Sequence, residues 1–292
     1  MRGVPSDDAF LVRALDDAVV LAVSDGAGSA PRAREGATLA VEKATEYLAA
    51  HQHELGVTAE QDEQVMDAAF TAVHDFIAEY ALAGNASADE FACTLLVVAI
   101  TSMYVCTAQI GDGAIVLGGN GHYWTLGGRA PSEYVNETVF MTSSAWRDSL
   151  SIIVLPTDCA PQVDDIAVLT DGLEPIALSH VGRAPHSPFF FGLFRWLHES
   201  DSSDGALGQF LSSDRVRAKC DDDLTLVIVS RSDSQRPEYW QETLGPPPFE
   251  TSDPVGSVAI PMKPPVALRM RSLLRRPLLA LLRTVRKWVR RA

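Results

Sequence analysis

The order of apolar segments of different periodicity limits most strongly what this 292-residue chain can fold into. A short buried strand is predicted at 18–23 (AVVLAV), and apolar residues at helical spacing then predict helices over 33–50 and about 59–82. Two strand-like runs, 93–101 and 104–110, follow with a two-residue connection, which is typical of a β-hairpin. Helices followed by consecutive strands favour antiparallel sheets with helices packed on them over a βαβ winding.

The second half of the chain continues this pattern. A largely helical stretch is expected from Phe189 to Leu211, interrupted by a polar loop at 199–205. Its aromatic residues, which include Phe194 and Trp196, are expected to pack in the core rather than form a recognition surface. Further strands are predicted at 114–117, 122–125, 151–155, 166–170 and 224–230.

The charge is distributed unevenly along the chain. The formal net charge is −14, yet the segment from Val266 to Ala292 holds nine Lys and Arg residues and no acid. The remaining chain therefore carries 15 basic against 38 acidic residues. A body this acidic would repel phosphates, so nucleic acid is not expected as a partner.

The cysteines and the N-terminus indicate a reducing, cytoplasmic location. Cys93, Cys106, Cys159 and Cys220 form no CxxC pair, and the first two lie in apolar runs where a buried thiol is favoured over a redox or zinc role. The opening residues MRGVPSDDAF do not resemble a signal peptide, and no uninterrupted apolar run reaches the ~18 residues of a spanning helix.

Composition divides the chain into three parts. Residues 1–232 are expected to form the folded domain, and 233–265 a proline-rich linker, since eight of the 17 prolines fall between Pro237 and Pro265. Residues 266–292 are predicted to form a basic amphipathic helix that starts near Pro277. Such a helix suits an anionic membrane surface, a docking position on the acidic domain, or a groove on a partner protein.

Several of the predicted strands border an aspartate. Asp25 and Asp171 each end a strand and precede glycine, Asp112 lies in IGDGAIV, and Asp222 precedes the strand of CDDDLTLVIV. A single Asp-Gly pair is ordinary turn chemistry, but four at the ends of the strongest strands are not explained that way. Carboxylates that converge at one sheet edge repel one another, and a hard divalent cation resolves the conflict. Ligation by oxygen alone favours Mg²⁺ or Mn²⁺ over zinc.

The ordered series of motifs resembles the metal-dependent type 2C Ser/Thr protein phosphatases, in particular their bacterial subgroup. The resemblance covers about residues 6–230. The segments that carry it are SDDAF, DGAGSAPRAREGATLAVE, CTLLVV, IGDGAIV, EYVNETVF, LTDGL and DDDLTLVIV.

This resemblance implies an α+β fold, an α-β-β-α sandwich of two antiparallel sheets flanked by helices, to which the C-terminal amphipathic helix is added. It also implies a dinuclear Mn²⁺ or Mg²⁺ centre. Asp25 would bridge the two metals, and the Gly26 carbonyl would bind one of them. Asp171 and Asp222 would complete the coordination of the first metal. Asp7 and Asp8 match the acidic pair near the second metal, and Asp112 matches the ligand of a third, weaker metal.

The family hydrolyses phosphate esters by attack of a metal-bound hydroxide, so no side-chain nucleophile is needed. The substrate implied is a phosphorylated protein, and a Ser/Thr kinase is the opposing enzyme. The family carries an Arg or His a few residues before the acidic pair to hold phosphate, and Arg2 is the candidate here, at a spacing that differs from the usual one. The alternative hypothesis is that the protein is a catalytically silent scaffold or a module that binds phosphoproteins.

Overall fold

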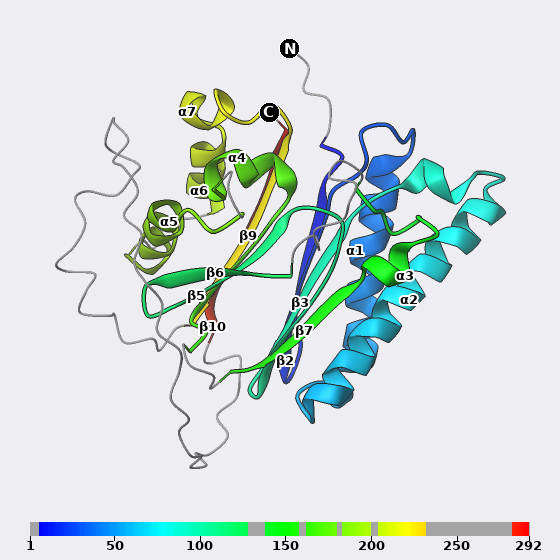
Figure 1. Ribbon diagram of the computed structural model, residues 1–292, viewed down its shortest axis with the longest axis horizontal. Helices are drawn as coiled ribbons and strands as arrows, with labels where there is room; N and C mark the ends of the chain where they lie inside the picture. The colour runs from blue at the N-terminus through cyan, green and yellow to red at the C-terminus, as the bar shows by residue number, and fades with distance from the viewer. Residues whose placement is uncertain are drawn as a thin grey trace.

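A computed structural model gives the structure of this chain, and it describes residues 6–127, 138–157, 162–179, 183–199, 204–231 and 282–291. Two sheets face each other, and helices cover the outer face of each (Figure 1). The α+β sandwich of antiparallel sheets expected from the sequence is therefore confirmed.

The first sheet has the strand order β1-β2-β3-β4-β7, with every neighbouring pair antiparallel. Its strands are β1 (Ala9–Ala14), β2 (Ala18–Ser24), β3 (Leu95–Thr101), β4 (Tyr104–Ile110) and β7 (Ser151–Pro156). Helices α1 (Ala33–Ala50) and α2 (Ala59–Ala83) lie on its outer face, and the short helix α3 (Trp146–Ser149) lies beside them (Figure 1).

The second sheet has the strand order β10-β9-β8-β5-β6, again antiparallel throughout. Its strands are β5 (Ala114–Gly119), β6 (His122–Leu126), β8 (Asp165–Leu169), β9 (Asp223–Arg231) and β10 (Leu282–Arg291). Its helices are α4 (Glu174–Ala177), α5 (Ser187–Glu199), α6 (Asp204–Leu211) and α7 (Asp214–Arg217).

Three apolar layers hold this arrangement together. Val19, Leu21 and Val23 of β2 belong to the layer between the sheets, whereas Val20 and Ala22 belong to the layer beneath α1 and α2. A third layer, which includes Phe190 and Phe194, packs helices α5 to α7 onto the second sheet. Because successive side chains of a strand point to opposite faces, β2 is buried on both sides, and every residue in it except Ser24 is apolar.

The aromatic run of α5 is core, as expected from its composition. Phe190, Phe194 and Leu197 are buried, and Tyr123 of β6 lies against both phenylalanine rings at 5.7 and 5.9 Å between centroids. Cys93 and Cys106 are also buried, as predicted, while Cys159 lies outside the described residues.

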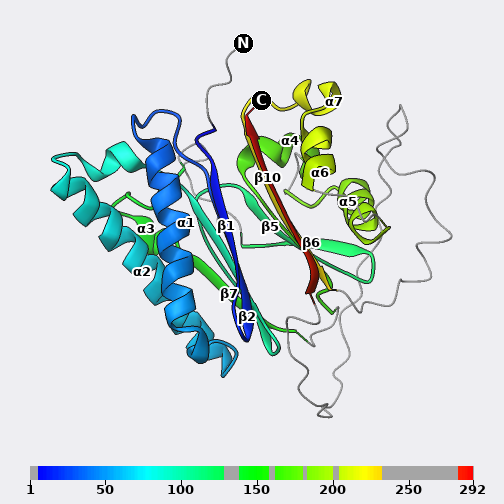
Figure 2. The same cartoon turned by 180° about the vertical axis from the view of Figure 1, so that it is seen from behind.

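The C-terminal tail departs from the sequence prediction. Residues 282–291 form strand β10, antiparallel to β9, so the amphipathic helix predicted for 266–292 is wrong over these residues. Residues 266–281 and the linker 233–265 lie outside the described part of the chain. Pairing with β10 supplies hydrogen-bond partners to the side of β9 that β8 leaves open (Figure 2), and Val285, Trp288 and Val289 favour strands. Within the described residues, no helix is long and apolar enough to cross a membrane.

The contact between α1 and the 3-10 helix Ala88–Phe91 provides a test of this packing. A Cβ added at Gly36 would overlap the carbonyl group of Phe91, whereas one added at Gly28 would meet no atom within 4 Å. We expect Gly36→Ala to lower the free energy of unfolding by about 2 kcal/mol or more, because backbone must move to accept the methyl group.

Denaturant unfolding of the two alanine variants beside the parent measures this effect, with Gly28→Ala as the matched control. Equal midpoints for Gly36→Ala and the parent would contradict the close approach of α1 to Phe91.

Candidate metal centre

Asp25 directly follows β2 and is fixed there by Thr94. Its backbone N–H donates to Thr94 Oγ1 at 2.9 Å, and the Thr94 N–H donates to the Asp25 carbonyl at 2.8 Å. The next residue must be small, because a Cβ at Gly26 would lie 2.7 Å from the carbonyl carbon of Ala33 and 2.8 Å from the carbonyl oxygen of Asp7. The Asp-Gly pair therefore serves close backbone approach rather than a simple turn.

Asp112 lies at the turn from β4 to β5, where the chain passes from the first sheet to the second. Gly111 and Gly113 have φ angles of 95° and 81°, a conformation that favours glycine. Neighbouring chain also leaves no room for side chains there: a Cβ at Gly113 would lie 2.7 Å from the Leu169 carbonyl oxygen. The turn is thus pressed against the end of β8.

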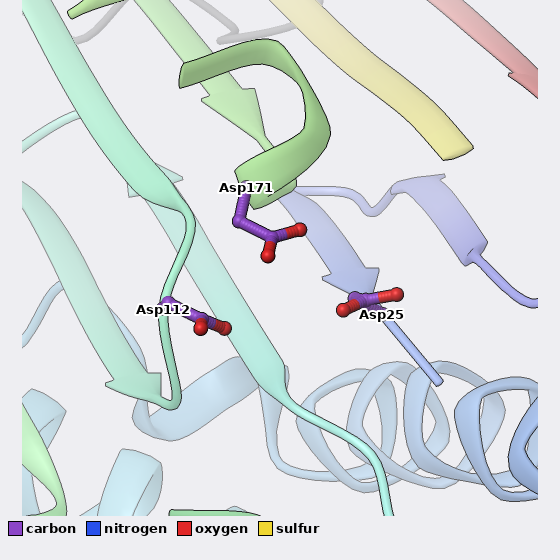
Figure 3. Close-up of side chains that lie close together, drawn as sticks. All are labelled: Asp25, Asp112 and Asp171. Carbon is purple, nitrogen blue, oxygen red and sulfur yellow. The ribbon is translucent and has the colours of Figure 1, made fainter. Parts of the chain in front are cut away.

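Asp171 follows β8 and begins the 3-10 helix Asp171–Leu173. Its carboxylate, that of Asp25 and that of Asp112 each offer an oxygen, and these three atoms lie within 4.8 Å of one another. Figure 3 shows the three side chains turned toward a common space from three separate elements. The two sheets thus contribute to one acidic cluster at the end of the sandwich, which we call the aspartate trio (Asp25, Asp112, Asp171).

Asp8 lies deeper, beside Asp25. Its Oδ2 accepts hydrogen bonds from Thr225 Oγ1 at 2.6 Å and from Thr170 Oγ1 at 3.0 Å. Its Oδ1 is buried and accepts no hydrogen bond from the described part of the chain. Asp8 and Asp25 also interact electrostatically, and the charge of Asp8 contributes to the raised pKa of Asp25.

The remaining predicted residues lie around this centre. The Asp222 carboxylate is exposed and outside the aspartate trio, but its charge raises the pKa of Asp25 and of Asp171. Asp7 contributes its backbone, since its N–H donates to Asp223 Oδ2 at 2.7 Å and its carbonyl lies against Gly26. Arg2 lies outside the described residues.

Burial and mutual repulsion raise the pKa of these acids. Burial, then hydrogen bonding and charge from Asp8, raise the pKa of Asp25, and burial also raises the pKa of Asp8. The pKa of Asp171 rises to about 7, because of burial first and then the charges of Asp112 and Asp222. Perturbed carboxyls gathered at one place are typical of functional sites.

These residues fit divalent cations. The candidate ligand atoms are carboxylate oxygens, which Mg²⁺ and Mn²⁺ prefer. Among the described residues, no group donates a hydrogen bond to the buried Oδ1 of Asp8. A bound cation would offset the mutual repulsion of these carboxylates, which raises their pKa values. The metal-binding interpretation of the acidic motifs is therefore consistent with the geometry.

Sequence reasoning missed the threonines that support the acids: Thr94, Thr138, Thr170 and Thr225. Thr170 directly precedes Asp171, and Thr225 lies three residues after Asp222. Those spacings were visible in the sequence. The sequence could not predict that both hydroxyls donate to Asp8, because these residues lie 162 and 217 positions from it in the chain.

Comparison with known proteins agrees with this site. The family model described as protein phosphatase 2C matches residues 1–212, which is more than half of the chain. Serine/threonine-protein phosphatase 3 of Escherichia coli K12 is 34% identical over 215 residues, which cover 71% of this chain and 81% of that protein.

Solved structures show the same fold. A bacterial serine phosphatase superposes with a TM-score of 0.57 at 13% identity, covering 80% of this chain and 94% of the other. A sex-determining protein of C. elegans gives a TM-score of 0.56 at 14% identity, covering 78% of this chain and 62% of that protein. The chain belongs to the protein phosphatase 2C family, whose members are metal-dependent protein phosphatases.

Proposed function

We propose that this protein hydrolyses phosphoserine and phosphothreonine esters in proteins at a centre of two Mn²⁺ or Mg²⁺ ions. The observation that carries the proposal is the aspartate trio, whose oxygens lie within 4.8 Å of one another in a member of a phosphatase family. Ser/Thr specificity is favoured by the similarity to the E. coli serine/threonine-protein phosphatase.

The proposed roles follow the order of the motifs. Asp25 would bridge the two ions and the Gly26 carbonyl would bind one of them, which the close packing around Gly26 supports. Asp171 and Asp222 would complete the coordination of the first ion. Asp112 would hold a third, weaker one.

Asp7 and Asp8 would serve the second ion in this scheme. Asp8 is held by Thr170 and Thr225, and its charge acts on the neighbouring Asp25, so it would help to position the bridging carboxylate. Asp7 lies against Gly26 through its backbone. Arg2 is proposed to contact the substrate phosphate.

When bound, the divalent ions supply an acidified water and neutralise charge on the phosphoryl oxygens. The polypeptide would contribute positioning, because the ends of β2 and β8 and the β4–β5 turn hold the carboxylates together at one end of the sandwich. A cysteine nucleophile has no support among the described residues. Burial raises the pKa of the Cys93 thiol to about 12 and also raises those of Cys106 and Cys220.

The alternative is a silent scaffold that binds phosphoproteins without hydrolysing them. The retained acids favour catalysis, because buried carboxylates that repel one another destabilise a protein that has no cation to bind. A Ser/Thr kinase remains the proposed opposing enzyme, and the cytoplasmic location stays a prediction. The membrane interpretation of 266–292 relied on a helical apolar face, which residues 282–291 do not form.

Replacing either Asp25 or Asp171 by Asn tests the catalytic proposal. We expect each variant to lose Mn²⁺-dependent hydrolysis of para-nitrophenyl phosphate by at least about 100-fold. The reason is that loss of a partner behind a metal ligand already costs about 10- to 100-fold, and these changes remove a ligand itself. Steady-state rates measured against Mn²⁺ concentration give the comparison.

Asp17→Asn serves as the control, since Asp17 is exposed in the β1–β2 turn at the other end of β2. Of two peptides with the same sequence otherwise, the one that carries phosphothreonine should be hydrolysed faster than the one that carries phosphotyrosine. A parent protein that binds phosphothreonine peptide but shows no Mn²⁺-dependent turnover would establish the scaffold instead.

The raised pKa values predict how the metal-free protein responds to pH. Folded Asp171, with a pKa of about 7, binds its proton more tightly than in the unfolded chain, where the pKa is near 4. The free energy of unfolding should therefore fall as pH rises from about 4 to about 7, and the raised pKa of Asp25 extends the loss to higher pH. Thermal unfolding in EDTA between pH 5 and pH 8 measures this loss.

Three comparisons make the pH experiment specific. Mn²⁺ should raise the melting temperature most at pH 8, and Asp25→Asn should raise that of the metal-free protein at pH 8 while weakening the Mn²⁺ response. Asp17→Asn should leave the pH dependence as in the parent. If Asp25→Asn and the parent lose stability equally from pH 5 to pH 8, the buried repulsion is not present.

A further inference from the structure

The segment EYVNETVF (133–140) is a motif to which the proposed reaction assigns no role. Its described part begins at Thr138, whose Oγ1 donates a hydrogen bond to Asp112 Oδ2 at 2.7 Å. We propose that Thr138 is a positioning residue that holds the Asp112 carboxylate in the aspartate trio and thereby sets the affinity of the outlying metal site. This inference rests on the proposed function, because it assumes that Asp112 binds a cation.

Thr138 lies close in the chain to firmly anchored residues. Three residues later Met141 is buried, and its N–H donates to the Cys93 carbonyl at 2.8 Å. Cys93 in turn pairs with Gly26, directly after Asp25. The segment is also closed locally, since the Phe140 N–H donates to Ser143 Oγ at 3.0 Å. Thr138 is thus tied to the same part of the core that carries Asp25.

The main chain of the Asp112 turn is held by other residues. Gln109 Nε2 lies 3.2 to 3.3 Å from the carbonyl oxygens of Gly111, Asp112 and Gly113. Arg183 Nη2 donates to the Gly113 carbonyl at 2.8 Å and also to the Glu174 carboxylate. These contacts fix where the turn lies, whereas the Thr138 hydroxyl acts on the carboxylate itself.

The Asp112 carboxylate needs such a restraint because it faces like charge. Its own charge is the largest electrostatic cause, after burial, of the raised pKa of Asp171. Asp112 is partly exposed, so rotation of its side chain toward solvent would relieve the repulsion. A hydroxyl donor opposes that rotation without adding a positive charge that would compete with a cation.

A hydroxyl also leaves ligand capacity on the carboxylate. The bond from Thr138 uses Oδ2, and a carboxylate has about four lone-pair sites on its two oxygens. Hydrogen bonds behind metal ligands orient those ligands, and their loss commonly costs about 10- to 100-fold in metal affinity. Thr138 fits this role by chemistry and by distance.

Substitution of Thr138 by Val and by Ser tests the assignment in the full chain. Val keeps the shape and removes the donor, whereas Ser keeps the donor. Calorimetric titration of the metal-free proteins with Mn²⁺ alone should show the weakest site about 10-fold weaker or more in Thr138→Val and close to the parent in Thr138→Ser. Hydrolysis of para-nitrophenyl phosphate by Thr138→Val should fall at limiting Mn²⁺ and recover at saturating Mn²⁺.

A double-mutant cycle separates positioning from general damage. In an Asp112→Asn background, Thr138→Val should cause no further loss of Mn²⁺ affinity, because its partner is already altered. Thr157→Val, which removes an exposed hydroxyl that donates to the Ser102 carbonyl at 2.9 Å, should leave Mn²⁺ affinity unchanged.

Parent-like Mn²⁺ affinity in Thr138→Val would overturn the proposal, and so would an equal loss in the Asp112→Asn background. A parent that binds Mn²⁺ but hydrolyses no phosphate ester would refute the proposed function alone. The calorimetric comparison would still decide the role of Thr138 in that case.

Discussion

Repulsion among buried carboxylates at one end of the sandwich is the constraint on which the rest of the structure depends. Asp8, Asp25 and Asp171 all have raised pKa values, since burial and neighbouring acids disfavour their ionised forms. The chain overcomes this cost by fixing each acid to a rigid element. Asp25 and Asp171 follow fully buried strands, and Asp112 lies in a turn that crosses between the sheets. The cluster is therefore preorganised for cations before any cation arrives.

Threonine hydroxyls are the common device by which these acids are held. Thr170 and Thr225 donate to Asp8, and Thr138 donates to Asp112. Thr94 Oγ1 accepts a hydrogen bond from the backbone N–H of Asp25. A neutral donor stabilises a carboxylate without supplying a counter-charge, so the net negative charge that attracts divalent cations is preserved. An arginine at the same places would pair with the acids and compete with metal.

The fold was largely predictable because its main elements have strong periodicity. The helices at 33–50 and 59–82 and the strand at 18–23 agree with α1, α2 and β2 to within about one residue. Strand β1 was not predicted, because its apolar run is only four residues long (9–12) and the strand is partly buried or exposed throughout. The tail was predicted as a helix from its apolar spacing, yet residues 282–291 pair with β9. No local sequence pattern shows that β9 has an edge available for pairing.

The sequence by itself determined the types of element, their order, and which aspartates border strands, since these depend on residues close together in the chain. The ordered motifs also sufficed to indicate the phosphatase family. Only the tertiary structure decided which acids meet: Asp25, Asp112 and Asp171 form the trio, while Asp222 lies outside it. It also decided that Thr138 reaches Asp112 across 26 residues and that Thr225 reaches Asp8 across 217. Such pairings depend on how two sheets pack and in which register, and packing is a property of the whole chain.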